Sequence, residues 1–335
     1  MSIPSTQKAV VVERTGGPEV LEYRTDYAIP APKDGQVLVK NEIAGINYID
    51  TYFRSGLYPS AKPEILGREA AGTVIALGAN TDGYGLKIGD RVIWLATSGY
   101  AEYSAVPAAK TLKLPDDLSY EDATAGFMSG LTVLALTRET YSVKPGNWVL
   151  VHAAAGGAGF LMTQVLKNIG ARVIGTAGGP EKVALVKGLG ADHVIDYRSR
   201  EGQDWVSVVM EVTGGTGVDV VYDSVGKDTW EGSLAVVKQK GTIVWFGNSS
   251  GPIPPLLLSR LSPKCIKVAR PTLFGYISTR EEFERYAYEL FDLLVSGAIK
   301  VRIYGIYALS DVRQAHLDLE DRKTVGKLLI KMAAY

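Results

Sequence analysis

A glycine-rich turn between an apolar run and a helical pattern is the first candidate for chemistry. Residues 149–160 read VLVHAAAGGAGF, so a β-branched run passes directly into the turn. Gly156 allows the backbone to approach a pyrophosphate, Gly159 allows the next helix to pack against the strand, and the helix N-terminus offers N–H groups to an anion. Ala154 replaces the first glycine of the usual G-x-G-x-x-G pattern. Because a strand precedes the turn and a helix and second strand follow it, the segment predicts a dinucleotide-binding βαβ unit.

The end of the next predicted strand indicates which dinucleotide is bound. NAD-binding proteins usually place Asp or Glu there to hold the ribose 2′-hydroxyl, whereas this chain continues after Thr176 as AGGPEK. Lys182 can reach a 2′-phosphate as a point charge, and Tyr197 or Arg198, after the third strand, can approach the same place. These residues predict NADPH rather than NADH. The alternative is that Lys182 is a solvated helix lysine and Tyr197 a surface aromatic.

Composition limits the class of protein. The chain has 335 residues, enough for two domains, and a formal net charge of zero, so no overall field attracts nucleic acid or an anionic membrane. No apolar run approaches the roughly 20 residues that span a bilayer, and the first residues lack the apolar core of a signal peptide. Cys265 is the only cysteine, which excludes an internal disulfide and a multi-cysteine zinc cluster. We therefore expect a soluble, cytoplasmic protein.

The pattern of expected secondary structure, which must position these residues, changes along the chain. Short β-prone runs separated by turns fill the first third and predict a compact, largely antiparallel, barrel-like domain. These runs are 8–13, 36–43, 71–77, 91–95 and 101–106. We expect this part of the domain to cover residues 1–121.

From Asp122 onward, strands alternate with helices, which predicts an α/β domain with a doubly wound parallel sheet over residues 122–270. The expected strands are 148–152, 172–176, 193–196, 218–222, 242–246 and 266–269. The expected helices are 123–140, 161–169, 182–189, 205–212 and 230–237. The tail, 271–335, shows a helix at 280–296, strands at 304–307 and 327–330, and a helix at 312–320. We expect this tail to return to the first domain.

Several motifs together resemble one family. They are GINYIDTYFRSGLY (45–58), GREAAG (67–72), HAAAGGAG (152–159), YDSVG (222–226), FGNSSG (246–251) and RKTVGK (322–327). They are similar to the medium-chain dehydrogenase/reductase superfamily and, within it, to the zinc-free NADPH:quinone oxidoreductases of the zeta-crystallin group. The resemblance runs over essentially the whole chain. It implies a Rossmann sheet joined to a GroES-like barrel catalytic domain.

Zinc-dependent relatives bind their catalytic metal through a Cys in a G-[IV]-C motif and a His in G-H-E. This chain has Asn47 and Arg68 at those places, and Ala125 near the third ligand. Zinc needs thiolate, imidazole or carboxylate ligands, so we expect no metal. The three histidines show no metal-like spacing and are expected to be structural: His152, His193 and His316.

Without zinc, quinone reduction needs placement and hydrogen bonds to the developing phenolate more than a Lewis acid. The resemblance implies that Asn47, Tyr48 and Tyr52 line an interdomain cleft that holds the quinone. Asn47 can donate to a carbonyl oxygen, Tyr52 can donate a hydrogen bond or a proton, and Arg54 can neutralise a hydroquinone anion. Packing is the alternative for each tyrosine, since the chain contains 18 of them.

The resemblance also implies a set of NADPH contacts. They are Tyr48, Tyr52, Gly156, Gly157, Gly178, Lys182, Tyr197, Ser224, Phe246, Gly247, Asn248, Ser249, Arg270, Thr272 and Arg322. We expect Arg270 and Arg322 to close over the pyrophosphate or the nicotinamide. For Arg322 the alternative is an ordinary interdomain salt bridge.

Assembly and function retain alternatives. Runs 241–246 and 265–269 would form an apolar sheet edge, and pairing with a second copy would give a homodimer. The alternative is a monomer whose edge is shielded by residues 250–262.

The leading function is zinc-independent, NADPH-dependent quinone reduction. The alternative enzyme reduces the double bond of an enone or alkenal, with Tyr52 as proton donor. Binding of AU-rich RNA, which the resemblance permits, is at most secondary, because no basic stripe is present.

Overall fold

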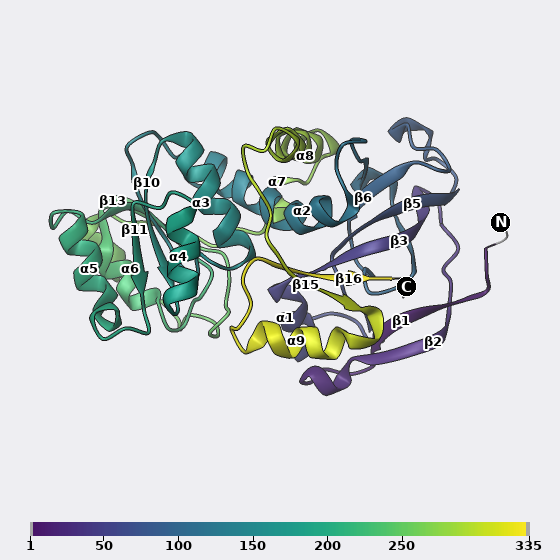
Figure 1. The fold of residues 1–335 in the computed structure, drawn as a ribbon, viewed down its shortest axis with the longest axis horizontal. Helices are drawn as coiled ribbons and strands as arrows, with labels where there is room; N and C mark the ends of the chain where they lie inside the picture. Colours follow the sequence, from purple (N-terminus) through teal and green to yellow (C-terminus); the bar gives the residue numbers. More distant parts are fainter. Residues whose placement is uncertain (1–2, 333–335) are drawn as a thin grey trace. The chain divides into compact units, whose positions relative to one another are not determined.

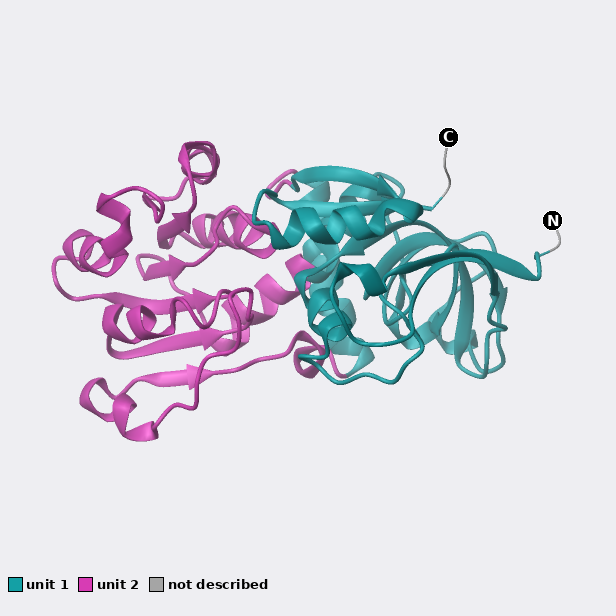
Figure 2. Cartoon of the chain, turned by 90° about the horizontal axis from the view of Figure 1, so that it is seen from below, with its two compact units in different colours: residues 1–128, 279–296, 301–335 teal, residues 129–278, 297–300 magenta. Residues whose placement is uncertain are grey.

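The computed structural model describes residues 3–332, and the chain divides into two compact units. Unit 1 comprises residues 1–128, 279–296 and 301–335, and unit 2 comprises residues 129–278 and 297–300 (Figure 2). The tail therefore returns to the first unit. The first change of unit falls inside helix α2 (Tyr120–Ala135). The domain boundaries predicted from the sequence, after 121 and 270, lie a few residues earlier.

Unit 2 is built on a six-stranded parallel sheet, which confirms the predicted Rossmann-like class (Figure 1). Its strands are β9 (Trp148–Val151), β10 (Arg172–Ala177), β11 (His193–Asp196), β12 (Val218–Asp223), β13 (Val237–Trp245) and β14 (Lys267–Ala269), in the order β11-β10-β9-β12-β13-β14. Strands are added outward from β9 to β11, and the chain then crosses to the other side of β9. Because such crossovers are right-handed, the helices before and after β11 cover opposite faces.

The helices of unit 2 are α3 (Gly157–Ile169), α4 (Pro180–Gly188), α5 (Trp205–Val212), α6 (Trp230–Val236) and the short α7 (Leu273–Tyr276). A π-helical turn, Leu136–Thr140, follows α2. Buried aliphatic residues of the central strands pack against α5 and α6, with Val209 and Leu234 in that core. Strand β13 begins at Val237, earlier than the predicted 242, because its first residues pair with the start of β12 before a bulge.

Unit 1 is a largely antiparallel assembly of two sheets. The larger has the order β15-β16-β3-β5-β6-β8, with β7 also paired to β3, and the smaller has the order β2-β1-β4. Its strands are β1 (Thr6–Val12), β2 (Glu22–Ala28), β3 (Gln36–Ile46), β4 (Glu64–Ile65), β5 (Glu69–Leu77), β6 (Arg91–Leu95), β7 (Tyr103–Pro107), β8 (Thr111–Lys113), β15 (Ile303–Ala308) and β16 (Lys327–Lys331). Its other helices are α1 (Tyr48–Ser55), α8 (Arg280–Val295) and α9 (Val312–Glu320).

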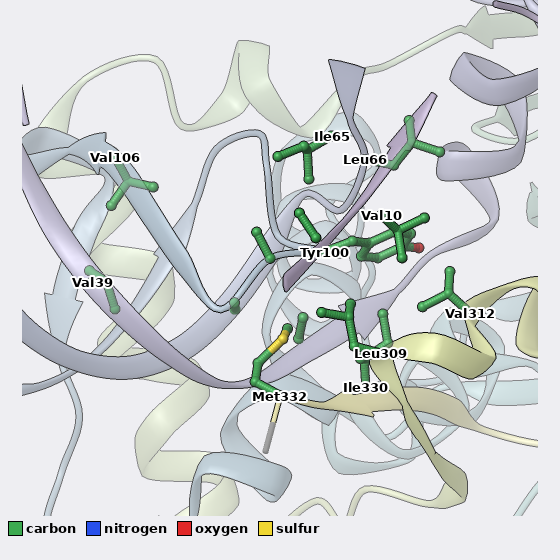
Figure 3. Packing of buried hydrophobic residues seen from close by; sticks show 14 of the residues in the cluster. Val10, Val39, Ile65, Leu66, Tyr100, Val106, Leu309, Val312, Ile330 and Met332 are labelled. Atoms are coloured by element: carbon green, nitrogen blue, oxygen red, sulfur yellow. The ribbon is translucent and has the colours of Figure 1, made fainter. Parts of the chain in front are cut away.

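The core of unit 1 combines both ends of the chain. Figure 3 shows Val10 of β1, Tyr100, Val312 of α9 and Ile330 of β16 in one buried cluster. Strand β16 pairs with β3 on one side and β15 on the other, so the tail is an interior part of this sheet. None of the helices within residues 3–332 combines the length and apolarity needed to cross a lipid bilayer.

Candidate active site

The carboxyl edge of the unit 2 sheet brings together most of the residues predicted to contact NADPH. The strand order reverses between β9 and β12, which is where doubly wound sheets bind their ligands. The relevant residues follow the strands in turn: Gly156 and Gly157 after β9, Gly178 and Lys182 after β10, Tyr197 after β11, Ser224 after β12, and Phe246, Gly247, Asn248 and Ser249 after β13. Arg270 and Thr272 follow β14, and Arg270 donates to the Trp245 carbonyl at 2.7 Å.

The glycine turn between β9 and α3 is closely packed. A Cβ atom on Gly159 would lie 2.4 Å from the Ala153 carbonyl oxygen and 2.7 Å from the Ala154 Cα atom. The Ala154 N–H donates to the Thr176 carbonyl at 2.9 Å, which ties the turn to the end of β10. Helix α3 begins at Gly157, directly after this turn. The turn and helix N-terminus therefore fit a pyrophosphate.

The loops after β10 and β11 form a cationic corner. A Cβ on Gly178 would meet the Tyr197 hydroxyl at 2.5 Å, so the phenol covers this glycine. The same Cβ would lie 3.0 Å from Arg198 Nε. Burial, and then the positive charge of Arg198, lower the pKa of Lys182. The Asp196 carboxylate accepts from the backbone N–H of Arg198 at 2.9 Å and orders the loop. Two cations beside a phenol fit a 2′-phosphate group.

His152, at the end of β9, is held in the interior of unit 2. Its Nδ1 lies 3.1 Å from the Thr176 hydroxyl, and its ring meets Trp205 edge to face at 4.8 Å between centroids. Burial lowers its pKa, against the opposing charge of Asp223. These contacts support the expected structural role of His152. His193 lies in β11, half-buried.

Helix α1 of unit 1 carries three of the predicted substrate and cofactor residues, although no helix was expected there. The Asp50 carboxylate accepts from the Asn47 backbone N–H at 2.9 Å, and Gly56 ends the helix with a φ of 84°. The Tyr52 side chain is 7% exposed, and its ring centroid lies 5.6 Å from that of Tyr48 and 5.1 Å from that of Tyr58. Burial raises the pKa of Tyr48.

Asn47 belongs to a polar cluster that the sequence did not predict. Its Nδ2 donates to Glu69 Oε1 at 2.8 Å, and its Oδ1 accepts from Lys327 Nζ at 2.5 Å. Lys327 also pairs with Glu69 Oε1 at 2.6 Å, and these two side chains are 5% and 0% exposed. The backbone N–H of Met128 donates to Glu69 Oε2 at 2.7 Å. The sequence offered one signal for this cluster: a charged residue, Glu69 or Lys327, begins each of the apolar strands β5 and β16.

Arg54 lies in a separate buried network. Its guanidinium donates to both carboxylate oxygens of Glu320, at 3.0 and 2.7 Å, and to His316 Nδ1 at 3.0 Å. Since arginine only donates, His316 Nδ1 is the acceptor and the ring proton lies on Nε2, which faces the Tyr100 hydroxyl at 3.2 Å. Burial, and then the charge of Arg54, lower the pKa of His316 to about 3. This geometry favours a structural role for Arg54 over the predicted neutralisation of a hydroquinone anion.

The Tyr100 hydroxyl extends this network to Asp50, donating to its carboxylate at 2.7 Å. Burial raises the pKa of Asp50 to about 6. Arg322 lies outside the network, exposed in the turn after α9 with a φ of 58°. The structure therefore places the predicted residues in two groups, one in each unit.

The positions that correspond to zinc ligands carry other chemistry. Arg68 donates to Glu64 at 3.0 Å, and its guanidinium carbon lies 3.8 Å from the centroid of the Phe53 ring. Ala125 is buried in α2. Among residues 3–332, no group of three or more His, Cys, Asp or Glu side chains could hold a metal ion.

Comparisons with known proteins agree with these features. The zinc-binding dehydrogenase family matches residues 157–293, and the alcohol dehydrogenase GroES-like domain matches residues 33–116. A quinone oxidoreductase of Salmonella typhimurium is 45% identical over 94% of this chain and 96% of its own. The solved structure of Escherichia coli quinone oxidoreductase complexed with NADPH has a TM-score of 0.93 and 42% identity, covering 97% of this chain and all of that one. A 2-haloacrylate reductase of Burkholderia is 35% identical, over 96% of this chain and 98% of its own.

Proposed function

The chain belongs to the zinc-free quinone oxidoreductases of the medium-chain dehydrogenase/reductase family, and we propose that it is an NADPH-dependent quinone oxidoreductase. The observation that carries this proposal is similarity to quinone oxidoreductases over nearly the whole of both chains. The cationic corner and the glycine turn support it independently, because they suit the 2′-phosphate and the pyrophosphate of NADPH.

Bound NADPH supplies the reducing equivalents for the quinone. The residues of unit 2 bind and orient this cofactor. The N-terminus of α3 stabilises the pyrophosphate charge, while Lys182 and Arg198 attract the 2′-phosphate and the Tyr197 hydroxyl can donate to it. Ser224 and the segment 246–249 complete the edge: a Cβ on Gly247 would lie 2.4 Å from the Ser224 carbonyl oxygen.

The residues of unit 1 act on the substrate. A quinone oxygen gains negative charge as the ring is reduced, and a donor that is already in place stabilises that charge. Asn47 is half-buried, and within residues 3–332 its amide nitrogen makes one hydrogen bond, to Glu69, so a second N–H remains for the substrate. Tyr52 is the proposed source of a second hydrogen bond or of a proton.

The test is NADPH oxidation with 1,2-naphthoquinone, followed by the loss of NADPH absorbance and repeated with NADH and with EDTA. We expect rapid turnover that strongly prefers NADPH and does not respond to EDTA. Tight NADPH binding without quinone reduction would contradict the proposal.

The similarity to a 2-haloacrylate reductase favours a second candidate, reduction of a carbon–carbon double bond beside a carbonyl group. This reaction needs a proton donor for the α-carbon, and Tyr52 is the proposed donor. Kinetics with 2-chloroacrylate and with a simple enone separate the two candidates. A kcat/KM for either that exceeds the value for the naphthoquinone would make double-bond reduction the primary activity.

We also propose that the protein is a homodimer that pairs through β14. This strand is at the outer edge of the parallel sheet, and Val268 within it is 37% exposed. Leu257 and Leu258, in the segment that leads to β14, are each 74% exposed. A second copy would cover the unpaired edge and these apolar side chains. The cytoplasmic location expected from the sequence stays a prediction.

A further inference from the structure

We propose that Lys327 and Glu69 are positioning residues, which act together to hold the Asn47 amide with its NH2 group available to the substrate oxygen. This inference rests on the proposed quinone reduction. Neither residue was a candidate from the sequence, and both are almost completely removed from solvent. A buried lysine–glutamate pair is weak evidence for stability, because desolvation of both charges offsets their attraction. A role in orienting a neighbour explains its presence better.

The hydrogen-bonding capacity of each group determines the orientation of the amide. A lysine ammonium only donates, so the Asn47 atom facing Lys327 must be Oδ1. A glutamate carboxylate only accepts, so the Asn47 atom facing Glu69 must be Nδ2. Lys327 and Glu69 therefore specify the same rotamer of Asn47 from opposite sides. The reversed amide would place two donors against the ammonium and an oxygen against the carboxylate.

The backbone of α2 provides the reference for this arrangement. The Met128 N–H donates to Glu69 Oε2, which leaves Oε1 for both Asn47 and Lys327. A backbone N–H cannot reverse its role, so it dictates which end of any side chain at position 69 it faces. A glutamine at that position would turn its oxygen to Met128 and its NH2 group to Asn47. Asn47 would then have to present its oxygen to position 69 and reverse.

A double substitution keeps the cluster neutral but reverses the Asn47 amide. In the double variant Glu69→Gln with Lys327→Met, no buried charge is left unpaired, so the fold is retained. The Asn47 oxygen then accepts from Gln at position 69, and the orientation that serves the substrate is lost. We expect kcat to fall about 100- to 1000-fold, the range for the loss of one donor to a developing oxyanion. NADPH affinity and the quinone KM should change by less than about threefold.

A mutant cycle that combines Asn47→Ala with the double substitution separates positioning of Asn47 from a general structural role. If the pair acts through Asn47, adding the double substitution to Asn47→Ala lowers kcat no further. Independent, multiplying losses in kcat would overturn the inference. The control is Lys113→Met with Asp90→Asn, which neutralises another ion pair of unit 1, 2.9 Å apart, and should leave kcat unchanged.

A second variant keeps the inference testable if the double variant does not fold. Lys327→Arg retains a cation that only donates, so it should retain at least about a third of the wild-type kcat. A loss as large as that of Lys327→Met would overturn the inference. Wild-type protein without quinone turnover would refute the proposed function instead, so the two failures are distinguishable.

Discussion

Replacing Gly159 with alanine tests the idea that α3 must approach β9 closely in order to hold a pyrophosphate. The added Cβ would lie 2.4 Å from the Ala153 carbonyl oxygen, whereas ordinary contacts begin at 3.4 Å. The helix would have to move away from the turn by about 1 Å, the difference between these distances. Both the Ala153 oxygen and the Ala154 Cα, at 2.7 Å, are backbone atoms, so no rotamer change can relieve the clash.

The expected loss of stability follows from two opposing terms. Overpacking of a well-packed site costs about 1–3 kcal/mol, and a backbone clash of this size belongs at the upper end. Alanine is a better helix former than glycine by about 1 kcal/mol. The net decrease in the free energy of unfolding is therefore about 2 kcal/mol. The shift also moves the N–H groups of α3 from the phosphate position, so NADPH affinity should fall about tenfold, equivalent to one charge-assisted hydrogen bond.

Urea unfolding followed by tryptophan fluorescence measures the first effect, and titration with NADPH measures the second. Four of the five tryptophans lie in unit 2, so the signal reports mainly on the unit that carries the substitution. The control is Gly188→Ala in α4, where nothing lies within 4 Å of the added Cβ and stability should rise by about 0.5–1 kcal/mol. If Gly159→Ala unfolds at the same urea concentration as the wild type and binds NADPH equally well, the close-approach reasoning is wrong.

Three further experiments test other parts of the structure. Lys182→Met should raise the Kd for NADPH about 10- to 100-fold and leave that for NADH unchanged, while Lys187→Met on the exposed side of the same helix should change neither in a fluorescence titration. Because the pKa of His316 is about 3 when folded against an ordinary 6.5, its contribution is present above about pH 6.5 and lost as pH falls toward 3. Urea unfolding at about pH 7.5 and about pH 5 measures how much free energy of unfolding the protein loses on acidification. His316→Gln should make this loss smaller by about 2 kcal/mol, because about 1.5 pKa units separate pH 5 from 6.5. Val268→Asp combined with Leu258→Asp should convert the dimer to a monomer in sedimentation, and a wild-type protein that sediments as a monomer would contradict the proposed edge pairing.

The sequence predicted elements best where the signal was local. Strand β11 and helices α5 and α9 have the predicted bounds, because apolar periodicity and neighbouring turn residues define each of them. Helix α1 was missed, because its β-branched and aromatic residues have low helix propensity. Its limits are set by the Asp50 contact to Asn47 and by the left-handed Gly56. Strand β2 was also missed, since it is a largely exposed edge strand without an apolar run.

The candidate site divides in the same way. Gly156, Gly159 and Lys182 could be identified because the glycine turn and the next strand end are continuous stretches of sequence. The partners of Asn47 could not, because Glu69 lies 22 residues away and Lys327 lies 280 residues away. Likewise, the sequence shows that Arg54 is a cation but not that α9 supplies the Glu320 carboxylate that neutralises it.

The return of β16 to the interior of unit 1 imposes an order on biosynthesis. Residues 129–278 form one continuous stretch that holds nearly all of unit 2, and they leave the ribosome before the tail. Strand β3 must wait for β16, which is separated from it by most of the chain, so its long loop closes late. A nascent chain can therefore gain its nucleotide-binding half while the half that contains Asn47 is still incomplete. Lys327, the first residue of β16, arrives with the strand that finishes the fold, so folding and substrate competence are completed together.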